Sequence, residues 1–142
     1  MNFLEFVFDK AAQCGWQVSE VLTDSMVKLT FETSMGDEYV YIRPYGKNTD
    51  GNTVIEFTSL GIPVPDDPID AGSIGLYLLQ RNGEMLLGNW GIEILNEQRH
   101  FTVFAKLIAN TMDIDEFKGA VTAIVGERIR VAKSAQKNAI DF

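Results

Sequence analysis

The sequence predicts a single α+β domain, in which an antiparallel sheet packs with helices in the order α-β-β-β-(β)-α-β-β-α. Three observations predict it. Residues 2–14 and 114–132 carry apolar side chains at helical spacing. Residues 26–33 alternate apolar and polar side chains, as a strand with one buried face does. A pair of strand-like segments over residues 86–108 comes directly before the last helix, and strands grouped in this way are typical of an α+β fold.

The first helix is expected over residues 2–14. Asn2 is a residue type that caps helix N-termini, and Gly15 is one that ends helices. The apolar side chains of this helix follow more than one helical stripe. Such a helix is either deeply packed or has one side that faces a partner, and the sequence leaves both interpretations open.

Four strands are then expected, over residues 16–22, 26–33, 38–43 and 53–60. Residues 34–37 contain glycine and aspartate and predict a hairpin turn between the second and the third strand. In the third strand, Val40 and Ile42 share one face. Pro44 lacks the amide hydrogen that a central strand needs, so we expect it to end this strand or to lie at a sheet edge.

The connection after the fourth strand is rich in proline. Residues 61–68 contain three of the four prolines of the chain. Because proline lacks the backbone donor that helices and central strands use, we expect this segment to be an extended crossover. Residues 69–82 then predict a second helix, with Ile74 and Leu78 facing inward.

The last third of the chain begins with two more strands. Residues 86–95 are expected to form the first, with Trp90, Ile92 and Ile94 on one face. A turn over residues 96–98 leads into the second. That strand, over residues 100–108, is expected to direct four apolar side chains to its inner face, namely Phe101, Val103, Ala105 and Leu107.

The last helix has clear end signals. Asp113 and Glu116 have the spacing of a capping box. The helix is expected from residue 114 to about residue 132 or beyond, with acidic residues at its start and basic residues near its end, which complements the helix dipole. We therefore expect one domain over residues 1–133 and a fraying polar tail over residues 134–142.

Composition excludes several functions. The 142 residues include 12 basic and 20 acidic ones, and the net charge is −8. Because nucleic-acid binding depends on Lys and Arg that neutralise phosphates, we expect no nucleic-acid partner. No run approaches the roughly 18 apolar residues that span a membrane, and the N-terminal apolar stretch lacks the basic region of a signal peptide. Cys14 is the single cysteine, which excludes an intrachain disulfide and fits a reducing compartment. We expect a cytoplasmic protein with no membrane partner.

Residues with catalytic or metal-binding potential are few. His100 is the single histidine, and it starts a strand after a turn, where an exposed polar residue is common. Cys14 has only Lys10 as a close basic neighbour, so we interpret it as a small buried hydrophobic residue. The acidic residues at 113–116 are explained by helix capping, and those at 66–67 by the start of the second helix. We expect no catalytic residue, no metal site and no cofactor.

Large side chains on the second face of the strands are the remaining signal. Two tyrosines alternate with Val40 and Ile42, and two apolar residues alternate with the inner side chains of the 100–108 strand. If helices cover only one face of the sheet, some of these residues are exposed, and exposed apolar patches are typical of interaction surfaces. If helices cover both faces or the sheet curls, they belong to the core. The candidate partner-binding residues are Tyr39, Tyr41, Phe104 and Ile108.

The order of these elements resembles the type III secretion chaperone-like fold, a superfamily that includes the YbjN-like proteins. The likeness is densest over residues 78–92, where Leu-Leu-Gln-Arg-Asn at a helix end precedes Gly-Asn-Trp-Gly-Ile in a short strand. The strand over residues 101–107 and the helix start at residues 113–117 are also similar. The resemblance brings no catalytic motif. It implies a non-enzymatic fold that often forms homodimers and binds other polypeptides through apolar surface.

Two functions follow as hypotheses. The first is a non-enzymatic protein-interaction module, chaperone-like or an adaptor, that binds another polypeptide and forms a homodimer. The alternative is a small-molecule-binding regulatory domain with a pocket between the sheet and the helices. The first predicts a dimer in solution, and the second predicts thermal stabilisation by a metabolite.

Overall fold

The computed structural model describes residues 1–137. They form a six-stranded antiparallel sheet of strand order β1-β2-β3-β4-β6-β5, with three α-helices, so the predicted fold class is confirmed. The elements in chain order are α1 (Phe3–Gln13), β1 (Val18–Thr23), β2 (Met26–Thr33), β3 (Gly36–Lys47), β4 (Thr53–Pro63), α2 (Pro68–Asn82), β5 (Asn89–Leu95), β6 (Gln98–Ile108), a 3₁₀ turn (Ala109–Thr111) and α3 (Ile114–Lys137).

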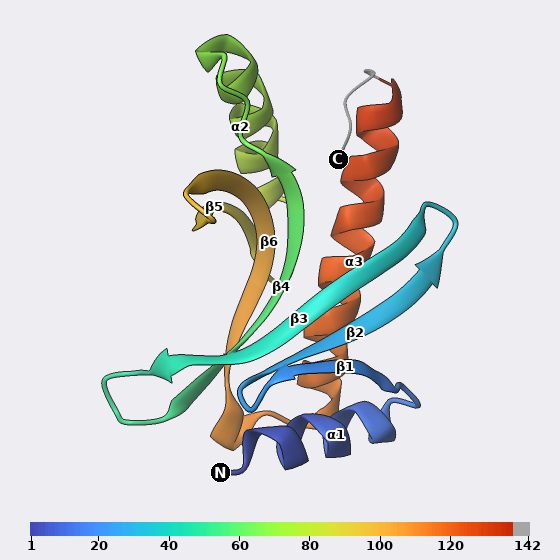
Figure 1. The fold of residues 1–142 in the computed structure, drawn as a ribbon, viewed down its shortest axis with the longest axis vertical. Helices are drawn as coiled ribbons and strands as arrows, with labels where there is room; N and C mark the ends of the chain where they lie inside the picture. Colours follow the sequence, from blue (N-terminus) through green and yellow to red (C-terminus); the bar gives the residue numbers. More distant parts are fainter. Residues whose placement is uncertain (138–142) are drawn as a thin grey trace.

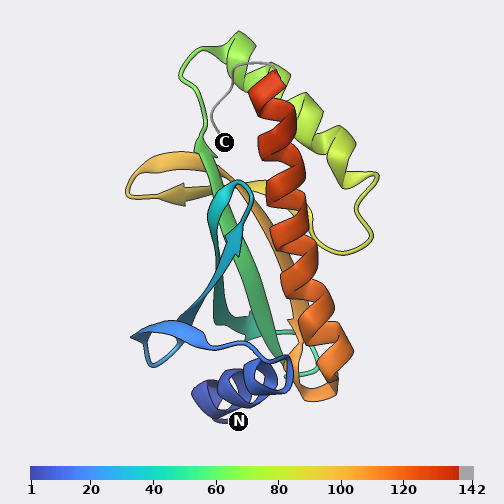
Figure 2. The ribbon, with the colours of Figure 1, turned by 90° about the vertical axis from the view of Figure 1, so that its right-hand side faces the viewer.

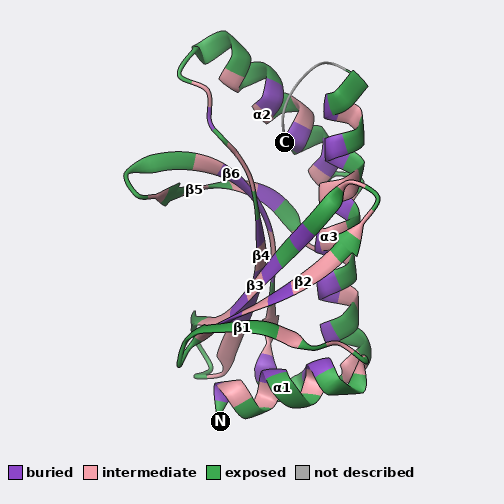
Figure 3. Cartoon of the chain, turned by 45° about the vertical axis from the view of Figure 1, so that its right-hand side comes forward, coloured by how far each residue is buried: buried purple, intermediate pink, exposed green. Residues whose placement is uncertain are grey.

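The helices lie on one side of a strongly twisted sheet. α3 runs along one face, α1 crosses the base of that face, and α2 lies beside the opposite end (Figure 1). Seen from the side, the β5–β6 hairpin bends away from α3 (Figure 2). The other face of the sheet carries none of the described helices, and the buried positions of β3 alternate with more exposed ones (Figure 3). In β4, the three consecutive residues Ile55, Glu56 and Phe57 are buried.

Local signals explain where the elements begin and turn. The Asn2 side chain accepts a hydrogen bond from the Glu5 amide, as an N-cap does. Asp113 and Glu116 bond to each other's backbone amides, which is the predicted capping box. The β5–β6 turn places Asn96 and Glu97 at φ 49° and 65°, and two consecutive positive φ values suit the twist of a tight hairpin.

The core lies between the sheet and α3, and Phe117 is its centre. This fully buried ring lies 5.4 Å from the Phe57 ring of β4 and 6.4 Å from the rings of both Phe6 and Trp16. Trp16 in turn packs edge-on against Phe31 of β2. Phe117 of α3 therefore contacts α1, the segment that follows α1, and the middle of the sheet.

Proline positions differ in part from expectation. β3 continues through Pro44 to Lys47 and does not end there. Pairing with β2 stops at Ile42, so Pro44 has β4 on one side only, and a register shift follows before Gly46. Residues 61–63 of the expected crossover belong to β4, where Pro63 pairs with β6 alone. At each of these two prolines, the strand has a neighbour on one side only. On the side without a neighbour, no hydrogen bond between strands is lost because proline lacks an amide hydrogen.

The last helix continues beyond residue 132, as the sequence allowed. α3 continues to Lys137, so residues 134–137 are helical, and the expectation of a fraying tail from residue 134 is wrong for them. Val131, Ala132 and Ala135 are buried, and packing of these small side chains stabilises a segment whose composition looks polar. Residues 138–142 of the expected tail lie outside the described residues.

Candidate interaction surface

The sheet face without a helix carries the predicted partner-binding residues. Strand register pairs Tyr41 of β3 with Thr58 of β4, and Thr58 with Phe104 of β6. These three side chains form a row across the middle of the face, which we call the open face. Tyr39 and Ile108 also point to this side, but they lie toward opposite ends, separated by about six residues or roughly 20 Å along the strands. The structure thus brings Tyr41 and Phe104 together and places the other two at the ends.

Close backbone contact fixes the position of the Phe104 ring. A Cβ atom on Gly91 of β5 would lie 2.8 Å from Cε1 of that ring, so a side chain there would require the ring to shift. The ring therefore lies over the β5 backbone and is half-buried. Gly91 is one of the residues on which the sequence resemblance rests. Its role in the structure is to allow the Phe104 ring to pack against the β5 backbone.

A second row on the open face is charged. Arg43 pairs with Glu56 and Glu56 with Lys106 in the strand register. Arg43 donates from Nε to Glu56 Oε1 at 2.8 Å, and Lys106 Nζ lies 3.9 Å from Glu56 Oε2. The Glu56 side chain is buried although it points away from the core, because these long neighbours cover it. Sequence reasoning missed this row, since its members are far apart along the chain and only the register brings them together.

Aromatic rings cover the cations of this row. Lys106 Nζ lies 3.6 Å from the centre of the Tyr45 ring and 5.0 Å from that of Phe104, and the Arg43 guanidinium lies 5.5 Å from the Tyr45 ring. Cation–π contacts at partly exposed sites contribute about 0.5–1 kcal/mol each. They hold Lys106 between the charged and the aromatic rows.

The β5–β6 hairpin adds a fourth charged group, Glu93. Burial raises the pKa of the Glu93 carboxyl, and repulsion from Glu56 raises this pKa further, while Arg43 and Lys106 oppose both effects. Glu93 lies on one wall of a groove of about 440 Å³ on the open face. Six of the residues that line the groove are Met26, Tyr41, Arg43, Thr58, Glu93 and Ile94.

A different apolar surface lies where α2 packs beside the edge strand β5. A groove of about 280 Å³ there is lined mainly by carbon, with Leu78 and Leu79 on the helix and Ile92 on the strand. Leu79 is 64% exposed and Ile92 53% exposed. Trp90, Ile92 and Ile94 occupy alternate positions of β5 and so share one face, as expected, but of the three only Trp90 is buried. Ile92 and Ile94 are exposed because the hairpin extends beyond the helices that cover Trp90.

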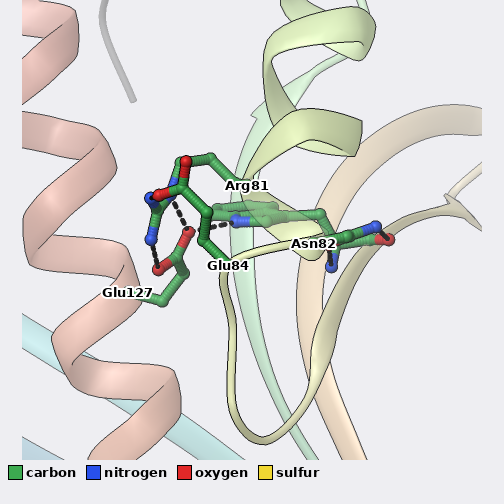
Figure 4. Close-up of polar contacts among 5 residues, drawn as sticks. Arg81, Asn82, Glu84 and Glu127 are labelled. Carbon is green, nitrogen blue, oxygen red and sulfur yellow. Dashed lines mark hydrogen bonds and ion pairs between the residues drawn. The ribbon is translucent and has the colours of Figure 1, made fainter.

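A buried ion pair holds α2 against α3 (Figure 4). Arg81 of α2 donates two hydrogen bonds of 2.9 Å to the carboxylate of Glu127 on α3, and a third contact joins it to Glu84. The Trp90 indole also donates to Glu127, at 3.0 Å. Burial favours a raised pKa for Glu127, but hydrogen bonds from Arg81 and Trp90 outweigh it and lower the pKa. The pair fixes the end of α2, and hence the apolar surface that α2 shares with β5.

Asn82 completes this attachment. Its side-chain oxygen accepts from the Trp90 amide at 2.6 Å, and its amide group donates to the Trp90 carbonyl at 3.2 Å. Asn82 thereby satisfies both backbone groups of an edge-strand residue that would otherwise need water or another strand. Asn82, which is one of the residues on which the sequence resemblance rests, therefore connects the end of α2 to β5.

Of the residues with catalytic or metal-binding potential, Cys14 lies apart from these surfaces, whereas His100 pairs with Glu93 of the groove in the strand register. Burial raises the pKa of the Cys14 thiol, with Lys118 and Lys10 opposing it and Asp115 adding to it, so the reactive thiolate is disfavoured. The His100 ring contacts the Gln98 carbonyl at 3.2 Å. Among residues 1–137, no three His, Cys, Asp or Glu side chains are grouped so that they could hold a metal ion. Within the same residues, none of the helices is long and apolar enough to cross a membrane.

Comparison with solved structures identifies the fold. The chain is similar to the crystal structure of YbjN from E. coli, whose role in transcription regulation is itself a proposal. The TM-score is 0.59 at 12% identity, over 98% of this chain and 95% of that one. It is also similar to a chain in the HopA1–SchA chaperone–effector complex, with a TM-score of 0.59 at 8% identity over 89% of each chain. The type III secretion chaperone-like fold is thus confirmed. No family model matches the sequence, and neither does any curated protein.

Proposed function

We propose that this chain is a non-enzymatic, chaperone-like or adaptor protein that binds another polypeptide and forms a homodimer. The observation that carries the proposal is the open face, where Tyr41 and Phe104 lie in one row that none of the described helices covers. A chain of the same fold occurs in a chaperone–effector complex, so the fold is compatible with a polypeptide partner.

The chemistry of the open face suits a polypeptide. Tyr and Phe offer large apolar area at low cost in side-chain entropy, and tyrosine adds a hydroxyl for the partner's backbone. Such aromatic side chains at the centre of an interface commonly contribute most of its binding energy. Tyr41 and Phe104 are therefore the proposed centre of the site, and Tyr39 and Ile108 its ends.

A double variant tests the polypeptide site. The probe is an unfolded model chain, reduced and carboxymethylated lactalbumin with a fluorescent label, and binding is measured by anisotropy. Tyr41→Ser with Phe104→Ser is expected to weaken binding by at least about ten-fold, since each central aromatic of an interface contributes about 2 kcal/mol. Leu86→Ser is the control, because Leu86 is fully exposed on the α2–β5 loop, near α3. Failure of the wild type to bind, or equal binding by the double variant, would contradict the proposal.

The homodimer is assigned to the apolar surface between α2 and β5. Leu79 and Ile92 are both more than half exposed there, and β5 is an edge strand whose outer side has no neighbour in the described sheet. A patch of this kind on a single chain is a predicted association site. It is separate from the Tyr41–Phe104 row, so a dimer formed through it leaves the open face accessible.

Leu79→Glu tests the dimer. A charge on this surface would have to be buried without a partner, which costs several kcal/mol, so the variant is expected to be a monomer at concentrations where the wild type is a dimer. Light scattering coupled to size-exclusion chromatography measures the mass. Leu86→Glu carries the same change on another exposed leucine and is expected to stay dimeric. A wild type that is monomeric at every concentration rules out the dimer.

A further inference from the structure

The end of α2 carries the one Asn-Gly sequence of the chain, Asn82–Gly83. Because glycine has no Cβ to shield its amide nitrogen, an asparagine before glycine is the asparagine most open to deamidation. In that reaction the deprotonated Gly83 nitrogen attacks Cγ of Asn82. The new N–Cγ bond closes a five-membered imide, and the Cγ–Nδ2 bond breaks with release of ammonia. Water then opens the imide at either carbonyl, which gives aspartate or isoaspartate.

Hydrogen bonds oppose this attack in the folded chain. The Asn82 side chain is directed to β5, where Oδ1 accepts from the Trp90 amide at 2.6 Å and Nδ2 donates to the Trp90 carbonyl at 3.2 Å. The attacking group, the Gly83 amide, donates to the Gln80 carbonyl at 3.2 Å. The Asn82 side chain must leave Trp90, and Gly83 must lose its acceptor, before the two atoms can join. The end of α2 therefore has to detach from β5 first.

One buried ion pair controls that detachment. Arg81, the neighbour of Asn82, is held by two hydrogen bonds of 2.9 Å to Glu127 of α3 (Figure 4). The next two residues, Gly83 and Glu84, are exposed. Helix ends detach locally at lower cost than a whole domain unfolds. Release of the Arg81 pair is thus enough to free residues 81–84 while the sheet stays folded.

The product of deamidation cannot restore the attachment. An aspartate at position 82 can accept from the Trp90 amide, but it has no hydrogen to donate to the Trp90 carbonyl. A carboxylate oxygen would then face a carbonyl oxygen. Isoaspartate in addition places the side-chain methylene in the main chain and lengthens the link between α2 and the loop after it. Both products weaken the contact between α2 and β5.

We propose that Asn82–Gly83 is a modification site that the attachment of α2 to β5 protects. Detachment of the helix end allows deamidation, and the product prevents the helix end from reattaching fully. Hydrolysis of the imide does not return asparagine, so the modification accumulates in proportion to the time that the helix end spends detached. The site lies at the α2–β5 surface, and it does not depend on whether that surface forms the dimer.

The test measures the deamidation rate of Asn82 by peptide mapping with mass spectrometry. The full chain is incubated in mildly alkaline buffer, with and without concentrated urea. The folded wild type is expected to react at least about ten-fold more slowly than the unfolded chain, because only the detached fraction reacts.

Two variants connect the rate to the ion pair. Arg81→Met is expected to raise the rate in the folded chain by at least about ten-fold, since detachment no longer breaks the pair with Glu127. Glu84→Gln removes only the exposed partner of Arg81 and is expected to change the rate by less than about two-fold. In concentrated urea the wild type and both variants are expected to react at the same rate.

Hydrogen exchange of the Trp90 amide measures detachment in the wild type itself. This amide donates to Asn82, so its exchange and the deamidation rate are expected to rise together in urea below the unfolding transition. Gly83→Ala separates the chemistry from the detachment. Gly83 has helical φ and ψ of −67° and −18°, and a Cβ there would lie 3.5 Å from the Gln80 carbonyl oxygen, which is ordinary contact. The variant is expected to keep the exchange rate and to deamidate several-fold more slowly.

Asn82→Asp reproduces one of the two products. It is expected to lower the Tm by about 2–4 °C. Asn96→Asp adds the same charge at an exposed turn and is expected to change the Tm by less than about 1 °C. A folded wild type that deamidates as fast as the unfolded chain, or an unchanged rate in Arg81→Met, would overturn the protection. An unchanged Tm for Asn82→Asp would overturn the proposed effect of the product.

Discussion

Arg81→Met is expected to lower the free energy of unfolding by about 3–5 kcal/mol, as breaking a buried ion pair on one side does. Glu127 is only 5% exposed in the structure. The substitution removes the cation that donates two hydrogen bonds to its carboxylate. Urea denaturation followed by circular dichroism measures the change. Glu84→Gln is the matched control, since it removes only the exposed partner of Arg81 and is expected to cost less than about 1 kcal/mol.

The double variant Arg81→Met with Glu127→Met separates charge from packing. Replacing both members of a buried pair by apolar residues is often neutral, so the double variant is expected to recover most of the stability that Arg81→Met loses. A loss below about 1 kcal/mol for Arg81→Met alone would show that the pair is solvated and does not tie α2 to α3.

Acid titration gives a second readout of the same pair. The folded-state pKa of Glu127 is lowered, so in the window below the ordinary glutamate pKa of about 4.3 the unfolded chain binds the extra proton. The stabilisation is fully present above that value and is lost as pH falls through the lowered folded-state pKa. The wild type is therefore expected to lose stability on acidification more steeply than the double methionine variant.

Phe117→Ala is expected to have a similarly large effect, about 3–5 kcal/mol, as for a buried phenylalanine removed from a packed core. The fully buried ring of Phe117 contacts the rings of Phe57, Phe6 and Trp16. Its loss would leave a cavity where α1, α3 and the sheet meet. Trp16 fluorescence in the folded state is expected to change as well, since its environment includes the deleted ring.

Phe8→Ala is the control for Phe117→Ala. Phe8 lies on α1 and is 46% exposed, so its removal is expected to change stability by less than about 1 kcal/mol. If Phe117→Ala cost less than about 1 kcal/mol, the packing of α1 against α3 and the sheet would be contradicted.

Local signals predicted most of the fold. Capping at Asn2, the capping box at Asp113 and Glu116, and the alternation over β2 all depend on residues within a few positions of one another, and each is present in the structure. The α+β class and the order of elements followed from them. Features that depend on contacts distant in sequence were less predictable.

Two features show why. Ile92 and Ile94 share the face of Trp90, as their alternation predicts, but both are exposed, since the β5–β6 hairpin bends away from α3 (Figure 2). Pro44 was expected to end β3 or to lie at a sheet edge, and it lies where β3 has only β4 as a neighbour, because the pairing of β2 with β3 starts at Val27 opposite Ile42. In each case, the relative length of neighbouring elements decides the outcome, and the residue itself does not.

The candidate surface was predicted in part. Alternation within β3 and β6 indicated that Tyr41 and Phe104 share a side opposite the core, and the register places them in one row. The charged row was not predictable, because Glu56 stands between buried residues and its partners come from strands on either side. Only the pairing of β4 with both β3 and β6 brings Arg43 and Lys106 to one carboxylate.

The central claim is that the open face binds polypeptide, and chemical-shift mapping tests it most directly. The ¹⁵N-labelled chain is titrated with the unfolded lactalbumin probe, and every perturbed amide is placed on the structure. The account predicts that the largest changes occur at Tyr41, Thr58 and Phe104 and that the exposed side of α3 is unaffected. Changes confined to α3 or to the α2–β5 loop, or no changes at all, would contradict it.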